Sequence, residues 1–471
     1  MANSARSRSA DPVVRVHAAV AHALATVRAS GTQGALPAVC VGLSGGVDSM
    51  VLLQAFASLA GQGGLRLSAV HVHHGLSPNA DGWATTCRSA CRRLKVPLSV
   101  VRVVVDRQSG LGIEAAARLQ RQRVFAAQRA DWIALGHHRD DQAETVLLQL
   151  LRGAGLRGLS GMPDGSEIVE AVAEGPRLLR PFLDLSRATL EACARQLGLS
   201  WIEDESNADT AFDRNFIRHA VMPLLEQRFP SARASLARSG RLLATSARLV
   251  EAIAAEDLQA ALEGSPVRPA GVSLAVLAAI GEGRARELLR EWLRRHGVPM
   301  PPERRLAEAL RQANEAGPER AVEIGFDGIT LRRYRDRLYL DRSHPAAAGG
   351  DAIAWNRRGR MALPALGGTL LAEPVRGAGI AQRLLRGAVL TIDARSRASG
   401  PAPRIAIGEP PMRRTLKNLW QESAVPPWQR DRWPLLRIGG ELACVPGLAV
   451  ASAFSARPGE AGRVFRWLVD G

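Results

Sequence analysis

The sequence of residues 38–152 alternates between short apolar stretches and longer stretches of helical character. The apolar stretches that are typical of buried strands cover residues 38–43, 67–73, 98–105 and 132–136. The predicted helices between and after them cover residues 49–59, 80–94, 113–129 and 140–152. Strands separated by helices of about 10–15 residues indicate βαβ units and a parallel sheet. We therefore predict an α/β fold with a doubly wound parallel sheet, whose ligands bind at the carboxyl ends of the strands.

The length of 471 residues predicts further domains beyond this sheet. The sequence after residue 230 is rich in Ala, Leu and Arg and reads as helical, and residues 321–340 resemble a β-hairpin. The last part mixes short predicted strands with one helix. The predicted divisions are a flexible or helical N-terminal extension (1–35), the α/β domain (36–230), a helical domain ending in the β-hairpin (231–345), a linker (346–375) and an α+β domain (376–471).

The chain is strongly basic. It has 62 Lys and Arg residues against 45 Asp and Glu residues, which gives a formal net charge of +17. Such a surplus favours a polyanionic partner, because binding releases counterions, and nucleic acid is the first candidate. Only Lys95 and Lys417 are lysines. The arginine excess therefore reflects either genome composition or function, and the sequence leaves both open.

Cysteine usage and hydropathy favour a cytoplasmic protein with no membrane partner. The five cysteines are odd in number and scattered along the chain, so they form no disulfide framework and fit a reducing compartment. No run of about 18 uncharged apolar residues predicts a transmembrane helix. Residues 1–11 are rich in Ser and Arg without a following apolar segment, which favours a disordered start over a targeting peptide.

A glycine-rich motif follows the first predicted strand and opens the first predicted helix. Its residues are Ser44, Gly45, Gly46, Val47, Asp48 and Ser49. The two glycines let the backbone turn tightly and approach an anion, and the N–H groups at the helix N-terminus can hold phosphate. The motif has no lysine and is not a Walker A loop. Asp48 would repel phosphate unless a cation lay between them, which indicates Mg²⁺.

Histidines end the second predicted strand. His71 and His73 point to one side of that strand and His74 to the other. They follow the glycine-rich motif by one βαβ unit, so we interpret them as residues that line a nucleotide site. Arg118 lies one turn into the predicted helix 113–129 and is a candidate clamp for phosphate, although solvated helical arginines are common in this chain.

The fourth predicted strand is followed by the sequence GHHRDDQAET, residues 136–145. On a helix, His137 and Asp141 are four residues apart, and so are Asp140 and Glu144, which brings acidic groups to one side. Like charges at this spacing destabilise an isolated helix. The pattern therefore predicts a bound cation, either Mg²⁺ or the ammonium group of a substrate.

The motif SGGVDS resembles the pyrophosphate-binding loop of the N-type ATP pyrophosphatases, which adenylate a carbonyl oxygen and release pyrophosphate. Further motifs are HVHHGLS (71–77), HHRDDQAET (137–145), and WIEDESN (201–207) followed by RNFIR (214–218). Together these motifs resemble the tRNA(Ile)-lysidine synthases over about residues 38–230. The resemblance implies an adenine nucleotide alpha-hydrolase-like fold. It also implies an ATP-dependent ligase that joins L-lysine to C2 of cytidine 34 in the CAU anticodon of tRNA(Ile), through an adenylated cytidine.

The same resemblance implies roles for particular residues. ATP would be bound by Ser44 to Ser49 together with His71, His73 and Arg118. The implied catalytic residues are Asp48, His137 and Asp141, of which the two aspartates would also hold Mg²⁺. The implied lysine-binding residues are Asp140 and Glu144, and the implied tRNA contacts in this domain are Arg214 and Arg218.

The sequences RRTLKNLWQ (413–421) and VPPWQR (425–430) resemble the last domain of the long form of that family. Basic residues alternate there with aromatic ones, a composition suited to backbone contact and base stacking on RNA. The predicted tRNA contacts are Arg413, Arg414, Lys417, Trp428 and Arg430. A small aromatic core with a solvated face is the alternative for Trp420, Trp428 and Trp433.

Two other functions use some of the same features. A tRNA thiolase would activate a similar carbonyl group but deliver sulfur through CxxC pairs or an iron–sulfur cluster, and the five cysteines supply no such pair. A non-catalytic RNA-binding protein would have a degenerate phosphate loop, and SGGVDS is intact. GMP synthetase is disfavoured because no amidotransferase domain is evident. The sequence does not give the oligomeric state and leaves a homodimer open.

Overall fold

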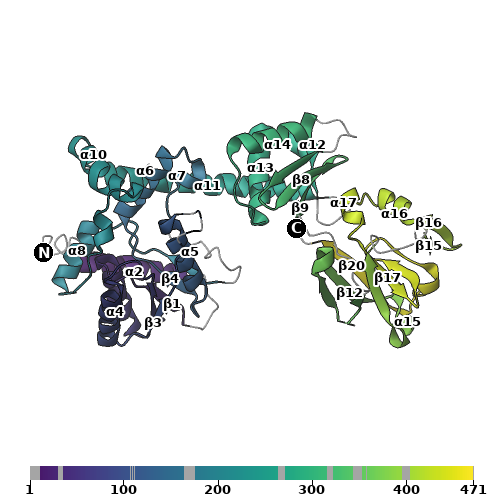
Figure 1. Cartoon of the computed structure of the whole chain (residues 1–471), viewed down its shortest axis with the longest axis horizontal. Coiled ribbons are helices and arrows are strands. Elements are labelled where there is room, and N and C mark those ends of the chain that lie inside the picture. Colours follow the sequence, from purple (N-terminus) through teal and green to yellow (C-terminus); the bar gives the residue numbers. More distant parts are fainter. Residues whose placement is uncertain are drawn as a thin grey trace, which may run out of the picture. The chain divides into compact units, whose positions relative to one another are not determined.

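The computed structural model describes residues 11–29, 36–106, 108, 110, 112–163, 175–263, 271–315, 322–342, 353–356, 358–394 and 404–469. The chain divides into two compact units, Met1–Arg248 and Leu249–Gly471 (Figure 1). Among the described helices, none has both the length and the apolar character needed to cross a membrane. Each unit is taken by itself below.

The first unit is built on a parallel sheet of five strands. The strands are β1 (Ala38–Gly42), β2 (Arg66–His73), β3 (Leu98–Arg102), β4 (Trp132–Ala134) and β5 (Arg177–Leu179). Their order is β3-β2-β1-β4-β5, and every neighbouring pair is parallel. This confirms the predicted doubly wound α/β fold. The sequence did not reveal β5, because a strand of three residues leaves too short an apolar pattern.

Helices connect the strands as the sequence predicts. They are α3 (Val47–Ala60), α4 (Ala80–Leu94), α5 (Ile113–Ala126), α6 (Arg139–Leu151), α7 (Leu156–Leu159) and α8 (Arg187–Gln196). The unit ends in α9 (Asp213–Phe216), the π-helical turn η2 (Ile217–Val221), α10 (Met222–Arg228) and the long α11 (Ala232–Leu262), which continues into the second unit. A short 3₁₀ turn, η1 (Glu205–Ala208), precedes α9.

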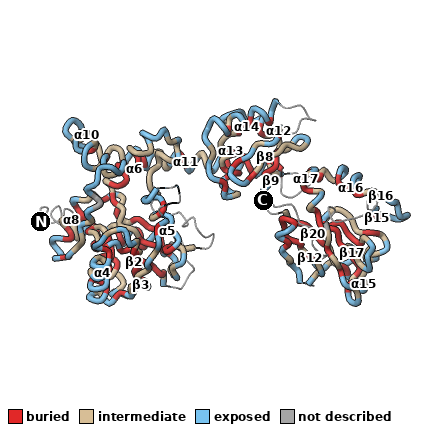
Figure 2. Tube along the Cα trace, viewed as in Figure 1, coloured by how far each residue is buried: buried red, intermediate tan, exposed pale blue. Residues whose placement is uncertain are grey.

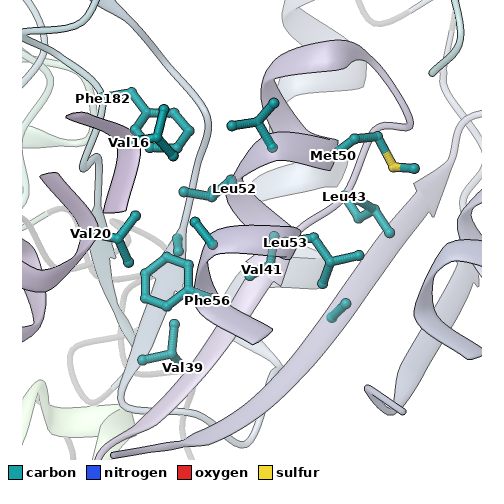
Figure 3. Close-up of a cluster of buried hydrophobic side chains, with 14 of the residues drawn as sticks. Val16, Val20, Val39, Val41, Leu43, Met50, Leu52, Leu53, Phe56 and Phe182 are labelled. Carbon is teal, nitrogen blue, oxygen red and sulfur yellow. The ribbon is translucent and has the colours of Figure 1, made fainter. Parts of the chain in front are cut away.

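The N-terminal segment belongs to the core of the first unit. Helix α2 (Pro12–Ala29) buries Val16 and Val20 in the same cluster as Leu52 and Phe56 of α3 (Figure 3). The extension predicted over residues 1–35 is helical at α2, as the prediction allowed, but α2 packs into the core of the α/β domain instead of lying outside it. Its apolar residues recur at helical spacing and need a partner surface, which α3 and α8 provide. Figure 2 shows where buried positions lie along the chain.

The topology places a crevice between β1 and β4. The chain leaves β1 toward β2 and β3 on one side, and β4 and β5 lie on the other. The connections after β1 and β4 therefore run to opposite sides of the sheet. This makes the edge between the two strands a topological switch point, where open α/β sheets bind ligands. The two loops come close together: a Cβ atom on Gly136 would lie 2.9 Å from the backbone carbonyl carbon of Asp48. Glycine at position 136 allows this approach.

The second unit begins with helices that cover a small antiparallel sheet. The helices are α12 (Leu274–Ala279), α13 (Glu282–Arg295) and α14 (Glu303–Glu315). The sheet has the order β6-β9-β8-β7, from β6 (Val272–Ser273), β7 (Glu323–Phe326), β8 (Ile329–Tyr334) and β9 (Arg337–Arg342). The predicted hairpin is thus a meander of the three strands β7, β8 and β9, and β6 pairs with β9 at its edge.

The C-terminal part of the second unit contains two further antiparallel sheets and a ribbon. One sheet joins β10 (Ile353–Ala354), β14 (Leu390–Ala394), β17 (Pro434–Ile438), β18 (Glu441–Val445) and β19 (Ala449–Val450). The other joins β11 (Arg360–Leu363), β12 (Gly368–Arg376), β20 (Ala461–Val469) and β13 (Ile380–Ala381). The ribbon pairs β15 (Arg404–Ile407) with β16 (Met412–Thr415), and the helices are α15 (Gln382–Gly387), α16 (Leu416–Glu422) and α17 (Pro427–Arg430). Two 3₁₀ turns complete it, η3 (Pro364–Leu366) and η5 (Ser452–Phe454).

The predicted linker over residues 346–375 is wrong for residues 360–375, which form β11, η3 and most of β12; residues 346–352 lie outside the described part of the chain. All of β12 pairs with β20, from Gly368 opposite Val469 to Arg376 opposite Ala461. The α+β domain therefore starts before the predicted boundary at residue 376. The local sequence does not reveal β12, because β12 pairs with β20, about ninety residues further along the chain, and local composition does not indicate such a pairing.

Candidate active site

The loop after β1 has the strand–loop–helix geometry that the sequence predicts. Gly45 has a φ of +95°, and a Cβ atom there would lie 2.5 Å from Cδ1 of Ile202. The Ile202 N–H group donates to the Gly45 carbonyl oxygen at 2.9 Å, so the WIEDESN segment lies directly against the loop. The Gly45 N–H donates to Ser49 Oγ at 3.1 Å and the Gly46 N–H to Ser44 Oγ at 3.3 Å. The loop is therefore fixed on both sides before any ligand arrives.

Asp48 occupies the first turn of α3 and faces the loop after β4. Its Oδ2 atom lies 3.7 Å from Nε2 of His138. Its Oδ1 atom is buried and has no hydrogen-bond partner among the described residues. Burial raises the pKa of Asp48, against the effect of His138, and the neighbouring Asp141 raises it further. A buried carboxylate oxygen without a donor is suited to a cation ligand.

The start of α6 differs from the prediction that places His137 on the helix. The helix begins at Arg139, and His138 is its N-cap. The Asp141 N–H donates to His138 Nδ1 at 3.3 Å, and the His138 N–H donates to Asp141 Oδ2 at 3.0 Å. His138 Nε2 also lies 3.5 Å from Asp141 Oδ2. The buried His138 therefore stands between Asp48 and Asp141, a position that the sequence analysis missed. The available signal was an acidic residue three positions after it, as in a capping box.

His137 has a different partner. Arg180, just after β5, donates from Nε to His137 Nδ1 at 3.3 Å and from a terminal nitrogen to the Pro163 carbonyl oxygen at 2.7 Å. The pKa of His137 is lowered to about 3, mainly by burial. The charge of Asp141 raises this pKa, and the charge of Arg180 lowers it. Guanidinium has no acceptor, so Nδ1 accepts and the single ring proton is on Nε2. His137 is thus neutral here, with an Nε2–H group that can donate a hydrogen bond.

Asp141 and Glu144 both form ion pairs with arginines. Arg214 contacts Asp141 at 2.8 Å and Glu144 at 3.1 Å. Arg218 contacts the same carboxylates at 3.0 and 2.7 Å, and Arg233 lies 3.9 Å from Glu144. The Glu144 side chain is only 1% exposed. Burial alone would raise the pKa of Asp141, but His138 and Arg214 lower it to about 2.

This network includes residues for which the sequence predicts contacts to tRNA or to lysine, and those roles stay predictions. Arg214 and Arg218, predicted as tRNA contacts, are committed to the two carboxylates, and both oxygens of Glu144 already accept from guanidinium groups. Asp140 lies in another environment: its Oδ2 accepts from the Arg187 N–H at 3.3 Å, and its Oδ1 is buried without a hydrogen-bond partner in the described chain. Asp140 and Glu144 therefore do not form a joint acidic surface.

The residues predicted from the second and third βαβ units occupy three different settings. His71 Nδ1 donates to the Leu43 carbonyl oxygen at 2.8 Å, and burial lowers its pKa. It thus supports the start of the glycine-rich loop. His73 Nε2 lies 3.3 Å from Asp81, and Arg118 is an exposed residue of α5.

The predicted tRNA contacts of the second unit separate into two groups. Trp428 packs edge-on against Tyr334 and Tyr339, at ring distances of 6.2 and 6.0 Å. Arg430 donates to the Tyr334 hydroxyl at 3.1 Å. Trp428 and Arg430 thus hold α17 against β8 and β9 while both stay partly exposed, and their contact with tRNA stays a prediction. Trp420 and Trp433 are buried.

The second group remains near the surface. Arg413 and Lys417 are exposed, and Arg414 pairs with Glu422. These three residues belong to β16 and α16, which follow directly on each other. The basic surface predicted for the last domain is therefore smaller than expected and centres on Arg413 and Lys417.

The fold and this site define an ATP pyrophosphatase of the PP-loop class. Residues 18–225 match the PP-loop domain, residues 273–339 the TilS substrate binding domain and residues 392–467 the TilS substrate C-terminal domain. The chain is 39% identical over 439 residues to a tRNA(Ile)-lysidine synthase of Azoarcus sp., covering 91% of each chain. It is 40% identical over 423 residues to that of Alkalilimnicola ehrlichii, covering 89% of this chain and 92% of the relative.

A third relative gives the same result. The chain is 41% identical over 417 residues to the tRNA(Ile)-lysidine synthase of Chromobacterium violaceum, covering 87% of this chain and 91% of the relative. The chain belongs to the tRNA(Ile)-lysidine synthase family. It is therefore an ATP-using ligase, which confirms the leading interpretation of the sequence over the thiolase and over a non-catalytic binding protein.

Proposed function

We propose that this enzyme joins the ε-amino group of L-lysine to C2 of cytidine 34 in the CAU anticodon of tRNA(Ile). In the first step the C2 carbonyl oxygen attacks the α-phosphorus of ATP, an O–P bond forms, and pyrophosphate leaves. In the second step the lysine amine attacks C2, the C–O bond breaks, and AMP leaves with the former carbonyl oxygen. The lysine ammonium group loses one proton to become a nucleophile and a second when the C–N bond forms; both protons go to solvent, and the remaining positive charge is shared by the ring and the new nitrogen. The observation that carries this proposal is the position of Asp48. It belongs to the SGGVDS loop and, at the switch point, faces His138, which also contacts Asp141.

The residues around Asp48 fit a divalent cation. The unpartnered Asp48 Oδ1 and the carboxylate of Asp141, which ionises readily, are hard oxygen ligands of the kind that Mg²⁺ prefers. A bound Mg²⁺ would neutralise charge that develops on the phosphates. His138 holds both carboxylates in place, while the N–H groups at the start of α3 bind the pyrophosphate. His71 keeps that loop in position, and His73 and Arg118 are proposed to line the ATP site.

The lysine substrate needs an acceptor for its ammonium group. Asp140 offers a buried Oδ1 that accepts no hydrogen bond and lies 3.9 Å from Nε of Arg139, next to the start of α8, so we assign it to lysine. We assign Glu144 a positioning role in lysine binding, through Arg214 and Arg218. His137, with its proton on Nε2, donates a hydrogen bond to an oxygen of the reacting groups.

The partner assignments rest on charge. The net charge of +17 and the exposed Arg413 and Lys417 suit the tRNA backbone. We place the enzyme in the cytoplasm, where five unpaired cysteines stay reduced. Formation of a homodimer stays a prediction, which the mass of the protein in sedimentation measurements would test.

The decisive experiment is incorporation of radiolabelled lysine into tRNA transcripts. Wild-type enzyme with ATP and Mg²⁺ should label the CAU transcript of tRNA(Ile) and not that of tRNA(Met), which shares the CAU anticodon. Asp48→Ala should abolish both labelling and pyrophosphate release while its circular dichroism stays that of the wild type. No incorporation by the wild-type enzyme, or full turnover by a folded Asp48→Ala variant, would overturn the proposal.

A further inference from the structure

A groove in the first unit lies beside the arginine network and has no part in the chemistry above. It is lined by Leu147 of α6, by Leu225 of α10, and by three serines at the start of α11. The serines are Ser231, Ser235 and Ser239, spaced four residues apart, so they follow one another along one side of the chain as it enters α11. The volume is about 510 Å³, within the roughly 300–1,000 Å³ of sites that hold small organic groups.

An exposed aromatic ring stands at the edge of this groove. Phe229 lies between α10 and α11 and is 60% exposed, which is unusual for so large an apolar side chain. The Arg228 guanidinium carbon lies 5.6 Å from the centre of its ring. Both residues line the groove, and its lining contains this guanidinium but no carboxylate. An aromatic face beside a cation is the arrangement on which unpaired bases stack and to which their phosphates are attracted.

Two helices connect the groove with the arginine network around Glu144. Leu147 follows Glu144 by one turn of α6. Arg233, which lies in α11 between the lining residues Ala232 and Ser235, comes within 3.9 Å of Glu144. A ligand that reaches Asp141 from the outside therefore has the groove next to it.

The reaction itself requires unpaired nucleotides in this region. Enzymes that modify a base draw it out of the stack, and its neighbours then lose a stacking partner. A surface with a free aromatic ring, one cation and a row of hydroxyl groups next to the active site can take up such a neighbour.

We propose that this groove binds an unpaired nucleotide adjacent to the reactive cytidine, with its base on Phe229 and its phosphate near Arg228. The proposal rests on the proposed function and deepens it by assigning part of the anticodon-loop site. The absence of acidic residues from the lining and the neighbouring arginine network favour RNA over a protein segment as the occupant.

The test measures binding of an isolated anticodon stem-loop RNA to the full chain, without ATP or lysine. Phe229→Ala should weaken binding about ten-fold or more, since stacking of one base carries a factor of roughly 5–150 in affinity. Phe229→Trp should restore it. Leu242→Ala is the matched control, because Leu242 is a 65% exposed apolar residue of α11 outside the groove lining, and it should bind like the wild type. With 2-aminopurine next to cytidine 34, wild-type enzyme should quench the fluorescence and Phe229→Ala should not.

Three outcomes would overturn the proposal. One is a folded Phe229→Ala variant that binds the stem-loop as tightly as the wild type. Another is an equal loss in Leu242→Ala. The third is a changed mass in solution of Phe229→Ala with unchanged RNA affinity, which would make the groove a protein interface. Lysine incorporation by the wild-type enzyme is measured separately, so failure of the proposed function is distinguishable from failure of the groove.

Discussion

Removal of the Glu144 carboxylate should destabilise the first unit strongly. Glu144 is 1% exposed and accepts from Arg214 at 3.1 Å and from Arg218 at 2.7 and 2.8 Å. Glu144→Ala leaves two partly buried guanidinium groups with Asp141 as their remaining partner. Breaking a buried ion pair on one side costs about 3–5 kcal/mol of unfolding free energy. For a unit of this size that is a fall of roughly 6 °C or more in the melting temperature.

A matched control shows how much of the loss in stability comes from burial of the ion pair and how much from the ion pair as such. Glu191 on α8 also binds two arginines, Arg187 at 3.0 Å and Arg195 at 3.1 Å, but its side chain is 29% exposed. Because water already screens this pair, Glu191→Ala should cost about 1 kcal/mol or less. Urea unfolding of both variants and the wild type, followed by circular dichroism, gives the comparison.

A second substitution, Glu144→Gln, tests the role assigned to Glu144 in lysine binding. If Glu144 acts by positioning, Glu144→Gln should lower stability and kcat together. The reasoning is refuted if Glu144→Gln is as stable as the wild type and raises only the KM for lysine. That result would mean that the substrate ammonium, and not the arginines, is the partner of this carboxylate during the reaction.

Three further predictions concern other parts of the chain. Gly45→Ala should abolish pyrophosphate release, because a Cβ atom there meets Ile202 at 2.5 Å and a φ of +95° is strained for alanine; wild-type turnover would contradict this. Asp141 has a pKa of about 2, below its ordinary value, so it should contribute about 2 kcal/mol of stability above pH 4 that is lost as the pH falls toward 2; an Asp141→Asn variant whose stability keeps the wild-type pH profile would contradict this. Replacement of Arg413 and Lys417 by alanine should reduce the salt slope of tRNA binding by about 0.9 or less per lost phosphate contact, and an unchanged slope would assign this surface to another role.

Local pattern was sufficient for the parts of this protein that short-range physics specifies. The strands β1 and β2 and the helix α4 lie where apolar runs and helical spacing predict them, and the glycine-rich motif forms the expected turn at Gly45. These features depend on neighbours in sequence: side chains alternate along a strand, a helix repeats every 3.6 residues, and only glycine accepts a positive φ without strain. The motif also contained enough chemistry to indicate a phosphate site.

What the tertiary structure alone decided is which charged groups meet. Arg214 and Arg218 lie about seventy residues beyond Asp141 and Glu144, and nothing in either segment specifies that they pair rather than bind RNA. Trp428 and Tyr334 are separated by still more of the chain, so exposure and packing of that tryptophan were equally compatible with its sequence. The sequence by itself determined the parallel sheet and its phosphate loop, because their signals are local. Partner choice among arginines, carboxylates and aromatic rings needed the fold, because only chain folding fixes distances between residues that are remote in sequence.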